Sequence, residues 1–425
     1  MLLANRYSLL VIHMSAFRQK NINKAFGNAM SKNKADTIFM KKALALAAKA
    51  KGRTSPNPMV GAVLVKGGNI IGAGYHKQAG TPHAEILALN KAGQNAKKAT
   101  LYVTLEPCCH TEKKTPPCTK EIIRSKVSKV VIAMTDPNPK VSGKGISELK
   151  GAGIQTQVGI MEPEAKKLNE AFTKFISTKK PFVTLKIAQS LDGRIATARG
   201  ESKWITGPEA RAYVHKLRDE VDAVLVGIGT VKKDNPSLDC RTGGGKNPFR
   251  IIVDSTLQIA LNSKVLKHGD GKTIIAATVR APKRKIERLR KEGHTVLIIG
   301  GDGTAKTRRP ARSNPGEHRV NLKRLMKELG KMEITAVMIE GGSSVAAAAL
   351  SEKIVDKVVF FIAPKIIGGT DAVPSVGGKS PVLLKNALKL YGTHINTFGS
   401  DICMEGYVKE ESAFELKTEH DKNFA

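Results

Sequence analysis

The chain has 425 residues, of which 41% are hydrophobic and 25% are charged. This length is too great for one ordinary core and predicts two or three globular domains. No apolar run approaches the roughly 20 residues that cross a membrane, so we expect no membrane association. The net charge of +33 is spread along the chain and only 4% of residues are aromatic, which favours a lysine-rich surface over nucleic-acid binding.

Cysteine usage points to a reducing compartment. Three of the five cysteines fall between residues 108 and 118, and such clustering argues against a disulfide framework. We therefore expect a cytoplasmic protein.

The first 35 residues contain no acidic side chain. We expect residues 1–35 to be a basic, disordered extension, although a transit-like leader would have a similar composition. Folding is expected to begin at Asp36, which can cap a helix, and residues 413–425 are expected to form a tail.

After this helix, a Pro-rich loop over residues 54–58 leads into a strand over 60–65, which a Gly-Gly-Asn turn joins to a strand over 70–75. Asn57 in the loop and His76 at the end of the second strand lie close in sequence to the motif that follows. Each of them either contacts a substrate or orders a loop, and the sequence does not choose between these roles.

The segment from His83 to Cys118 carries metal chemistry. A catalytic zinc needs three imidazole or thiolate ligands and one open position for water, and His83, Cys108 and Cys118 can supply the ligands. Zinc lowers the pKa of bound water to roughly 7, and Glu85 is placed to carry protons from that water to a leaving ammonia. H-x-E followed by P-C and a further cysteine is typical of zinc-dependent base deaminases.

Two features of this segment leave alternatives open. Nine residues separate Cys108 from Cys118, whereas the usual spacing is C-x-x-C, and Cys109 and His110 lie within the interval as further candidate ligands. A structural zinc knuckle is the other interpretation, but it would have four ligands and no use for Glu85.

Strands and helices alternate through the rest of this domain, which predicts a mostly parallel sheet covered by helices. The site should lie beyond the carboxyl ends of the strands. We expect the zinc domain to span residues 36–178. The expected strands cover residues 100–105, 129–134 and 154–159, and the expected helices cover 83–91, 118–126, 143–151 and 163–177.

A second α/β domain is expected over residues 181–412. Its strand over 334–339 leads into Glu340-Gly-Gly and an alanine-rich helix, whose N-terminus would favour a phosphate, although the full dinucleotide motif is missing. The basic stretch 280–319 predicts a helix followed by a solvated loop. The other expected strands cover residues 182–188, 222–227, 249–254 and 273–278, and the other expected helices cover 208–218 and 322–329.

Three polar or aromatic residues of this domain have two interpretations each. Trp204, the only tryptophan, either packs between elements or contacts a flat ring. Arg218 and Arg241 can grip a phosphorylated substrate, or they can form surface ion pairs.

Taken in order, the motifs resemble the bifunctional deaminase–reductase family of riboflavin biosynthesis over about residues 36–412. The motifs are S-P-N-P-M-V-G-A-V, P-H-A-E-I-L-A-L, V-T-L-E-P-C, T-P-P-C, S-L-D-G-R-I-A, E-S-K-W-I-T-G and A-P-K-I-I-G-G. The T-P-P-C element and the attached second domain separate this family from deaminases of tRNA and free nucleosides. The resemblance implies an α/β protein in which a cytidine-deaminase-like α/β/α zinc domain precedes a dihydrofolate-reductase-like α/β domain.

The resemblance also implies two successive reactions on a phosphoribosylaminopyrimidine: zinc-dependent hydrolysis of its 2-amino group, then reduction of its ribosyl group to ribityl by NADPH. His83, Cys108 and Cys118 match the Zn²⁺ ligands of the family, and Glu85 matches its proton shuttle. The positions that match NADPH contacts are Ala188, Trp204, Thr230, Asp234, Ser255 and the loop from Gly342. The positions that match substrate contacts are Ser202, Arg218, Leu238, Arg241 and Glu340.

The expected partner is thus a small phosphorylated pyrimidine and neither a nucleic acid nor a membrane, and we expect a homo-oligomer. The loop H-T-E-K-K-T-P-P-C is one residue longer than the common form of the family. Two other hypotheses stay open: a base deaminase whose basic second domain binds RNA, and a zinc-stabilised binding protein without reductase activity.

Overall fold

The computed structural model describes residues 34–109, 116–300 and 319–410. Its contacts divide the chain into two compact units: the first contains the chain up to Ala50 and Met59–Leu168, and the second contains Lys51–Pro58 and the chain from Asn169 onward. The expected boundary at residues 178–181 stays a prediction. Residues 34 and 35 of the extension expected over residues 1–35 lie in a helix over residues 34–48, so this helix does not begin at Asp36. The rest of that extension and the expected tail over residues 413–425 lie outside the described residues.

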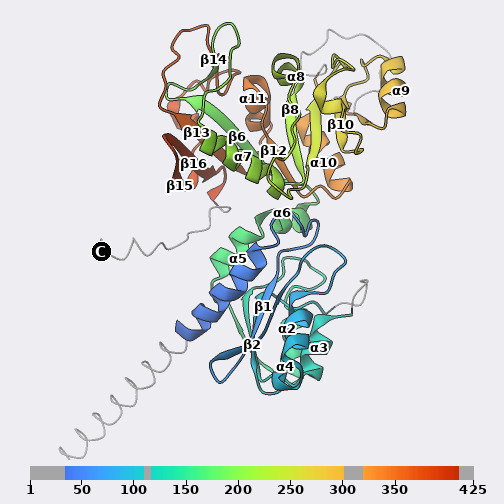
Figure 1. Ribbon diagram of the computed structural model, residues 1–425, viewed down its shortest axis with the longest axis vertical. Coiled ribbons are helices and arrows are strands. Elements are labelled where there is room, and N and C mark those ends of the chain that lie inside the picture. Colours follow the sequence, from blue (N-terminus) through green and yellow to red (C-terminus); the bar gives the residue numbers. More distant parts are fainter. Residues whose placement is uncertain (1–33, 110–115, 301–318, 411–425) are drawn as a thin grey trace, which may run out of the picture. The chain divides into compact units, whose positions relative to one another are not determined.

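The first unit is a sheet with the strand order β2-β1-β3-β4-β5. Helices α2, α3 and α4 lie on one side of it, and α5 and the helix over residues 34–48 lie on the other (Figure 1). The strands are β1 (Gly61–Lys66), β2 (Asn69–Tyr75), β3 (Thr100–Leu105), β4 (Lys129–Met134) and β5 (Gln155–Val158). The helices are α2 (Ala84–Ala92), α3 (Cys118–Arg124), α4 (Lys144–Gly151) and α5 (Glu162–Leu168).

Only part of this sheet is parallel. β3, β4 and β5 run parallel as expected, but β1 is antiparallel to both β2 and β3. The cause is the predicted hairpin between β1 and β2. Its two central turn residues, Gly67 (φ 56°) and Gly68 (φ 79°), have left-handed backbone conformations. Two-residue turns whose twist matches the twist of the flanking strands require this conformation. The hairpin prediction is confirmed. The strands expected to alternate with helices run parallel, and the antiparallel pairs of this sheet all involve β1 of the hairpin.

The helix expected over residues 163–177 is also wrong as a single element. The chain forms α5 and then α6 (Glu170–Thr178), with Asn169 between them outside helical geometry (φ −107°, ψ 24°). Asparagine is favoured at the position that precedes a helix, which explains why α6 starts anew after Asn169. The spacing of apolar residues, on which the prediction relied, does not mark this break.

The second unit contains a sheet with the strand order β11-β10-β9-β8-β12-β6-β13-β16-β15. Strands β11 to β13 in this order run parallel, and β16 and β15 are antiparallel to their neighbours. The strands are β6 (Phe182–Ser190), β8 (Ala223–Gly227), β9 (Phe249–Val253), β10 (Thr273–Ala277), β11 (Thr295–Ile298), β12 (Ala336–Ile339), β13 (Lys357–Ala363), β15 (Tyr391–Phe398) and β16 (Asp401–Tyr407). A separate pair consists of β7 (Arg194–Ala196) and β14 (Val373–Pro374).

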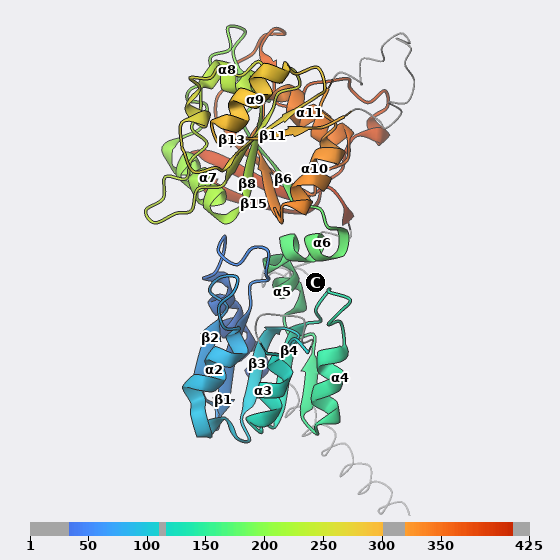
Figure 2. The ribbon, with the colours of Figure 1, turned by 90° about the vertical axis from the view of Figure 1, so that its right-hand side faces the viewer.

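Helices cover both faces of the large sheet (Figure 2). Leu225 of β8 packs in one buried cluster with side chains of α10 and α11, whereas Val224 and Val226 pack in another with side chains of α8 and α9. This alternation is the two-residue period of a strand, and apolar residues at every position therefore reflect burial on both faces. The helices are α7 (Pro208–Glu220), α8 (Ile228–Asp234), α9 (Lys283–Lys291), α10 (Leu322–Lys331) and α11 (Ser343–Ser351).

Several elements of this unit were missed from the sequence. The expected helix in the basic stretch is present as α9, but it is followed by β11 and not directly by a loop; residues 301–318 lie outside the described residues. No strand was predicted at β13, β15 or β16. β15 is mostly exposed and therefore lacks the apolar pattern that marks a strand in sequence. Among helices in the described ranges, none combines the length and apolar character needed to cross a membrane.

Candidate functional site

The three predicted zinc ligands come together in the first unit. His83 is the residue before α2, Cys108 follows the end of β3, and Cys118 is the first residue of α3. Their ligand atoms all lie within 4.8 Å of one another. The His83 Nδ1 atom lies 3.1 Å from Cys118 Sγ and 3.6 Å from Cys108 Sγ.

The three ligand atoms lie close enough to share one zinc ion, and the longer of the two nitrogen–sulfur separations matches a tetrahedral site. Zinc–sulfur and zinc–nitrogen bonds at a tetrahedral angle separate a nitrogen from a sulfur ligand by about 3.6 Å. One imidazole and two thiols are also the donor types that zinc prefers, and three protein ligands leave a fourth position for water. His83, Cys108 and Cys118 are thus able to hold a catalytic zinc.

Glu85 lies in the first turn of α2, next to this cluster, and is almost fully buried. Burial raises the pKa of its carboxyl above the ordinary value, and the charge of His83 opposes this shift only in part. Because α2 begins directly after His83, its first turn brings Glu85 and His83 to one site although residues two apart diverge along a regular helix.

Glu106 fixes the loop that carries Cys108. Its buried carboxylate accepts hydrogen bonds from the backbone N–H groups of Asp136 (3.2 Å), Gly143 (3.0 Å) and Ile146 (3.1 Å). The end of β3 is thereby tied to the loop after β4 and to the start of α4. The sequence reasoning placed the site beyond the carboxyl end of this strand but assigned no role to Glu106.

His76, for which the sequence allowed two roles, packs against the predicted zinc ligand His83. Its buried ring meets the ring of His83 edge-on, with 5.4 Å between centroids. Its backbone N–H donates to the carbonyl of Val60 at 2.9 Å. His76 therefore orients His83 and connects it to the chain that enters β1.

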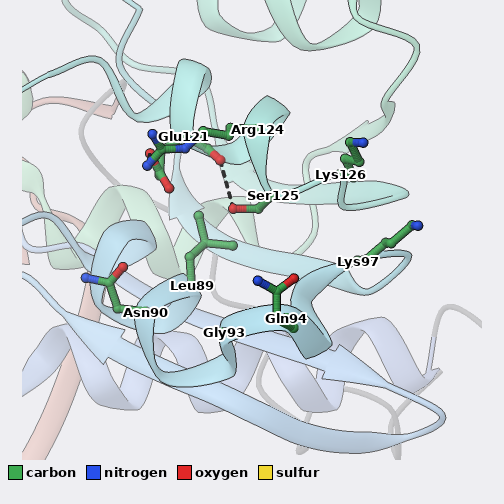
Figure 3. A pocket seen from close by; sticks show the side chains of 9 residues that line it. All are labelled: Leu89, Asn90, Gly93, Gln94, Lys97, Glu121, Arg124, Ser125 and Lys126. Carbon is green, nitrogen blue, oxygen red and sulfur yellow. Dashed lines mark hydrogen bonds and ion pairs between the residues drawn. The ribbon is translucent and has the colours of Figure 1, made fainter.

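Figure 3 shows a separate hollow in this unit, which is lined by none of the three predicted zinc ligands. α2 and α3 begin beside the cluster, and the hollow is lined by residues in and beyond their last turns. It therefore lies at the opposite ends of these helices and is not the zinc site. The lining residues are Leu89, Asn90, Gly93, Gln94, Lys97, Glu121, Arg124, Ser125 and Lys126.

In the second unit, several predicted site residues follow neighbouring parallel strands. The sheet places β9, β8, β12 and β6 side by side. The residues at their carboxyl ends are, in this order, Ser255, Thr230, Glu340 with Gly342, and Ala188. Because the carboxyl ends of parallel strands meet at one edge, these residues lie along the edge where α/β folds bind ligands.

A buried ion cluster forms at this edge. The Arg218 guanidinium donates from Nε to Glu340 Oε1 at 2.7 Å, from Nη2 to Oε2 at 3.0 Å, and from Nη1 to the Asp239 carbonyl at 3.0 Å. Lys186 Nζ lies 3.9 Å from the same carboxylate. Burial alone would raise the pKa of Glu340, but Arg218 and Lys186 hold it below its ordinary value. Arg241 joins this group through Asp239, whose Oδ1 accepts from its Nε at 3.3 Å.

The remaining predicted residues form smaller local groups. Ser202 Oγ donates to Asp234 Oδ1 at 3.2 Å. A Cβ built on Gly342 would lie 3.6 Å from Thr230 Oγ1, so these two positions are adjacent. Trp204 is 63% exposed, with the Arg211 guanidinium 4.5 Å from its ring centroid.

Leu238 is buried and adopts a left-handed backbone conformation (φ 56°) directly before Asp239. Sequence reasoning missed Asp239 and Lys186 as members of the ion cluster. For Lys186 a signal was available, because a lysine interrupts the apolar strand F-V-T-L-K-I-A, and a charge in such a strand is buried only when it is paired.

Two family descriptions match this chain. Residues 33–134 match the cytidine and deoxycytidylate deaminase zinc-binding region, and residues 181–404 match the RibD C-terminal domain. The fold and the zinc cluster therefore define a two-domain α/β enzyme in which a cytidine-deaminase-like domain precedes a reductase domain. The predicted fold class is confirmed.

The riboflavin biosynthesis protein RibD of Aquifex aeolicus is 45% identical over 368 residues, which are 86% of this chain and 97% of that protein. The chain belongs to the RibD family of riboflavin biosynthesis proteins, as its motifs predicted. The structure of Acinetobacter baumannii RibD is 36% identical with a TM-score of 0.77, over 88% of this chain and 99% of that one. A Thermotoga maritima protein, described as a diaminohydroxyphosphoribosylaminopyrimidine deaminase and 5-amino-6-(5-phosphoribosylamino)uracil reductase, is also 36% identical with a TM-score of 0.74, over the same shares.

Proposed function

We propose that the two units of this bifunctional deaminase and reductase of riboflavin biosynthesis act in turn on one small phosphorylated pyrimidine. In the first step, the 2-amino group of a phosphoribosylaminopyrimidine leaves by hydrolysis. In the second, the ribosyl group is reduced to a ribityl group. The observation that carries this proposal is the His83, Cys108 and Cys118 cluster with a buried carboxylate beside it, in a chain that also contains a RibD C-terminal domain.

For the deamination, His83, Cys108 and Cys118 would hold the zinc, which when bound supplies an activated water at neutral pH. Glu85 is the group that moves protons. Its carboxylate takes a proton from the water and gives it to the amino nitrogen, so that a carbon–oxygen bond forms and ammonia departs. The buried position of Glu85 beside the cluster supports this role, because bulk water then cannot compete for the proton.

For the reduction, NADPH would supply a hydride. The exposed ring of Trp204 offers a flat face to the cofactor, and the N-terminus of α11 after Gly342 offers bare N–H groups to a phosphate. The proposed cofactor contacts are Ala188, Trp204, Thr230, Asp234, Ser255 and Gly342. The proposed substrate contacts are Ser202, Arg218, Leu238, Arg241 and Glu340.

The proposal is tested with the purified zinc-loaded chain, the phosphoribosylaminopyrimidine and NADPH. Ammonia release and NADPH oxidation are both expected, with the second dependent on the first. Glu85→Gln should lower the rate of ammonia release about 10²- to 10⁴-fold while zinc content and NADPH oxidation on the deaminated substrate stay unchanged. Unimpaired ammonia release in this variant would contradict the role of Glu85.

The alternative of an RNA-acting base deaminase makes a different prediction. It requires RNA binding that weakens steeply with salt, together with inosine or uracil formation in RNA. Finding both, with no ammonia released from the small pyrimidine, would replace the present proposal.

We also propose a homo-oligomer in the cytoplasm. β15 lies at the edge of the large sheet, and Ile395 on it and Ile402 on β16 are 62% and 42% exposed. An exposed edge strand with apolar side chains favours pairing with another chain. Sedimentation should give a dimer or a larger oligomer that Ile395→Lys weakens, and a monomer at all concentrations would refute this proposal.

The proposed cytoplasmic location rests on the cysteines. Free thiols at all five cysteines support a reducing compartment.

A further inference from the structure

Two sequence motifs of the second unit, S-L-D-G-R-I-A and A-P-K-I-I-G-G, contain none of the proposed cofactor or substrate contacts. The first motif runs from the end of β6 into β7, and the second begins at the last residue of β13. β6 and β13 are parallel neighbours, with Ser190 opposite Ala363 where both strands end. The two motifs therefore leave the sheet side by side. We refer to residues 364–369 of the second motif as the 364–369 loop.

Asp192 of the first motif holds the 364–369 loop. Its Oδ1 atom accepts from the Ile367 N–H at 3.1 Å, and its Oδ2 atom accepts from the Gly368 N–H at 2.8 Å. The Ser190 hydroxyl donates to Oδ1 at 2.6 Å. These hydrogen bonds, the one from Ser190 foremost, lower the pKa of Asp192 to about 2. The carboxylate is therefore charged at neutral pH, and hydrogen bonds to a charged acceptor are the stronger ones.

Lys365 connects this loop to Trp204. The Lys365 carbonyl accepts from the Leu191 N–H at 2.7 Å, so that its backbone is fixed directly beside Asp192. Its side chain extends to the loop before α7, where Nζ donates to the Trp204 carbonyl at 2.8 Å. The position of the Trp204 backbone therefore depends on Lys365, and the position of Lys365 depends on Asp192.

A second cation, Arg211 near the start of α7, holds the same loop from the other side of Trp204 in sequence. Its Nη1 atom donates to the Thr206 carbonyl at 2.6 Å, and its guanidinium lies over the Trp204 ring, 4.5 Å from the centroid. The next residue, Gly207, donates its N–H to the buried Asp401 carboxylate at 2.6 Å. Because Arg211 covers one face of the ring and Trp204 is 63% exposed, the opposite face is the one open to a ligand.

We propose that Lys365 is a positioning residue for cofactor binding in the reductase unit. Together with Arg211 it fixes Trp204 so that the open face of the indole can lie against a flat ring of NADPH, and Asp192 keeps Lys365 in place. A side chain that must be ordered on binding weakens affinity, so a ring that is already fixed binds the cofactor more tightly. This inference rests on the proposed contact between Trp204 and NADPH.

The first test follows the ring itself, in the full-length, zinc-loaded chain without cofactor. Trp204 is the only tryptophan, so fluorescence anisotropy excited at wavelengths that tyrosine does not absorb reports the mobility of this ring alone. Lys365→Met should lower the anisotropy, and Lys365→Arg, which keeps a cation, should restore most of it. Lys285→Met is the matched control, because Lys285 Nζ also donates to a backbone carbonyl, that of Ile259 at 2.6 Å. It should leave the anisotropy unchanged.

The second test measures the cofactor. Lys365→Met should raise the KM for NADPH on the deaminated substrate about two- to tenfold, as expected when one side chain must be ordered on binding. The kcat at saturating NADPH and the rate of ammonia release should equal those of the parent chain. Asp192→Asn should act in the same direction in both tests, because its amide nitrogen would face one of the two backbone N–H groups of the 364–369 loop.

Unchanged anisotropy in Lys365→Met would overturn the proposal, and so would an unchanged KM or an equal loss in the control variant. A raised KM with unchanged anisotropy would also overturn it, because the effect would then not pass through Trp204. Should Lys365→Met fail to fold, Asp192→Asn decides the question by the same two measurements. If the parent chain neither binds nor oxidises NADPH, the proposed reductase function itself has failed, independently of Lys365.

Discussion

Glu340→Gln is expected to destabilise the second unit more than removal of Arg218, the main ion-pair partner of Glu340, does. The Glu340 carboxylate faces two cations, Arg218 through two hydrogen bonds and Lys186 at 3.9 Å. The side chains of Glu340 and Arg218 are only 8% and 15% exposed. Glutamine would leave both cations without a counter-charge and would turn an amide donor toward an Arg218 donor. Breaking a buried pair in this way costs about 3–5 kcal/mol.

Arg218→Met should cost less, about 1–3 kcal/mol, because Lys186 still compensates Glu340. Glu328→Gln is the matched control, because its partner Lys331 is largely exposed and such pairs contribute about 0–1 kcal/mol. The order of destabilisation should therefore be Glu340→Gln, then Arg218→Met, then Glu328→Gln.

The assay is a urea titration read by hydrogen exchange of peptides from β12 and α7, which follows the second unit separately from the first. The pH dependence gives an independent check. Because the folded pKa of Glu340 is lowered, its contribution is fully present above the unfolded pKa of about 4.3 and disappears as pH falls through the folded value. The parent chain and Glu340→Gln should therefore converge in acid. If Arg218→Met cost more than Glu340→Gln, or Glu340→Gln matched the control, our account of this cluster would be wrong.

Two further predictions concern the zinc ligands and the packing of α11. Cys118→Ser should reduce the bound zinc from about one ion per chain to well below one, because a hydroxyl is a poor zinc ligand. Elemental analysis measures this loss. Cys240→Ser, which lies outside the cluster, should retain the metal. Gly227→Ala should lower the free energy of unfolding by about 1–3 kcal/mol, because its Cβ would lie 2.6 Å from Val345 Cγ2. The loss should appear as a lower urea midpoint. Gly229→Ala, whose Cβ would meet nothing within 4 Å, should not lower the midpoint. Equal zinc in both cysteine variants, or equal midpoints in both glycine variants, would refute the respective argument.

Local sequence was sufficient to predict an element or a site wherever a short stretch has a composition or spacing that only one structure explains. β3 and β4 formed over the residues expected from their apolar runs, because strands buried on both faces need apolar side chains at successive positions. The hairpin followed from its glycine pair. The types and order of His83, Glu85, Cys108 and Cys118 predicted a zinc site, because few residue types ligate zinc.

Tertiary structure alone decided the relations between distant residues. Three such relations are the pairing of β13 with β16, the strand order of the large sheet and the contact of Lys186 with Glu340. Each joins segments that are far apart in the chain, and no sequence pattern indicates that they meet. Ser55 and Asp222 are 167 positions apart, and nothing near either residue indicates the other. The chemistry of the zinc segment could therefore be predicted from its sequence, whereas pairs such as Lys186 with Glu340 are formed only in the folded chain.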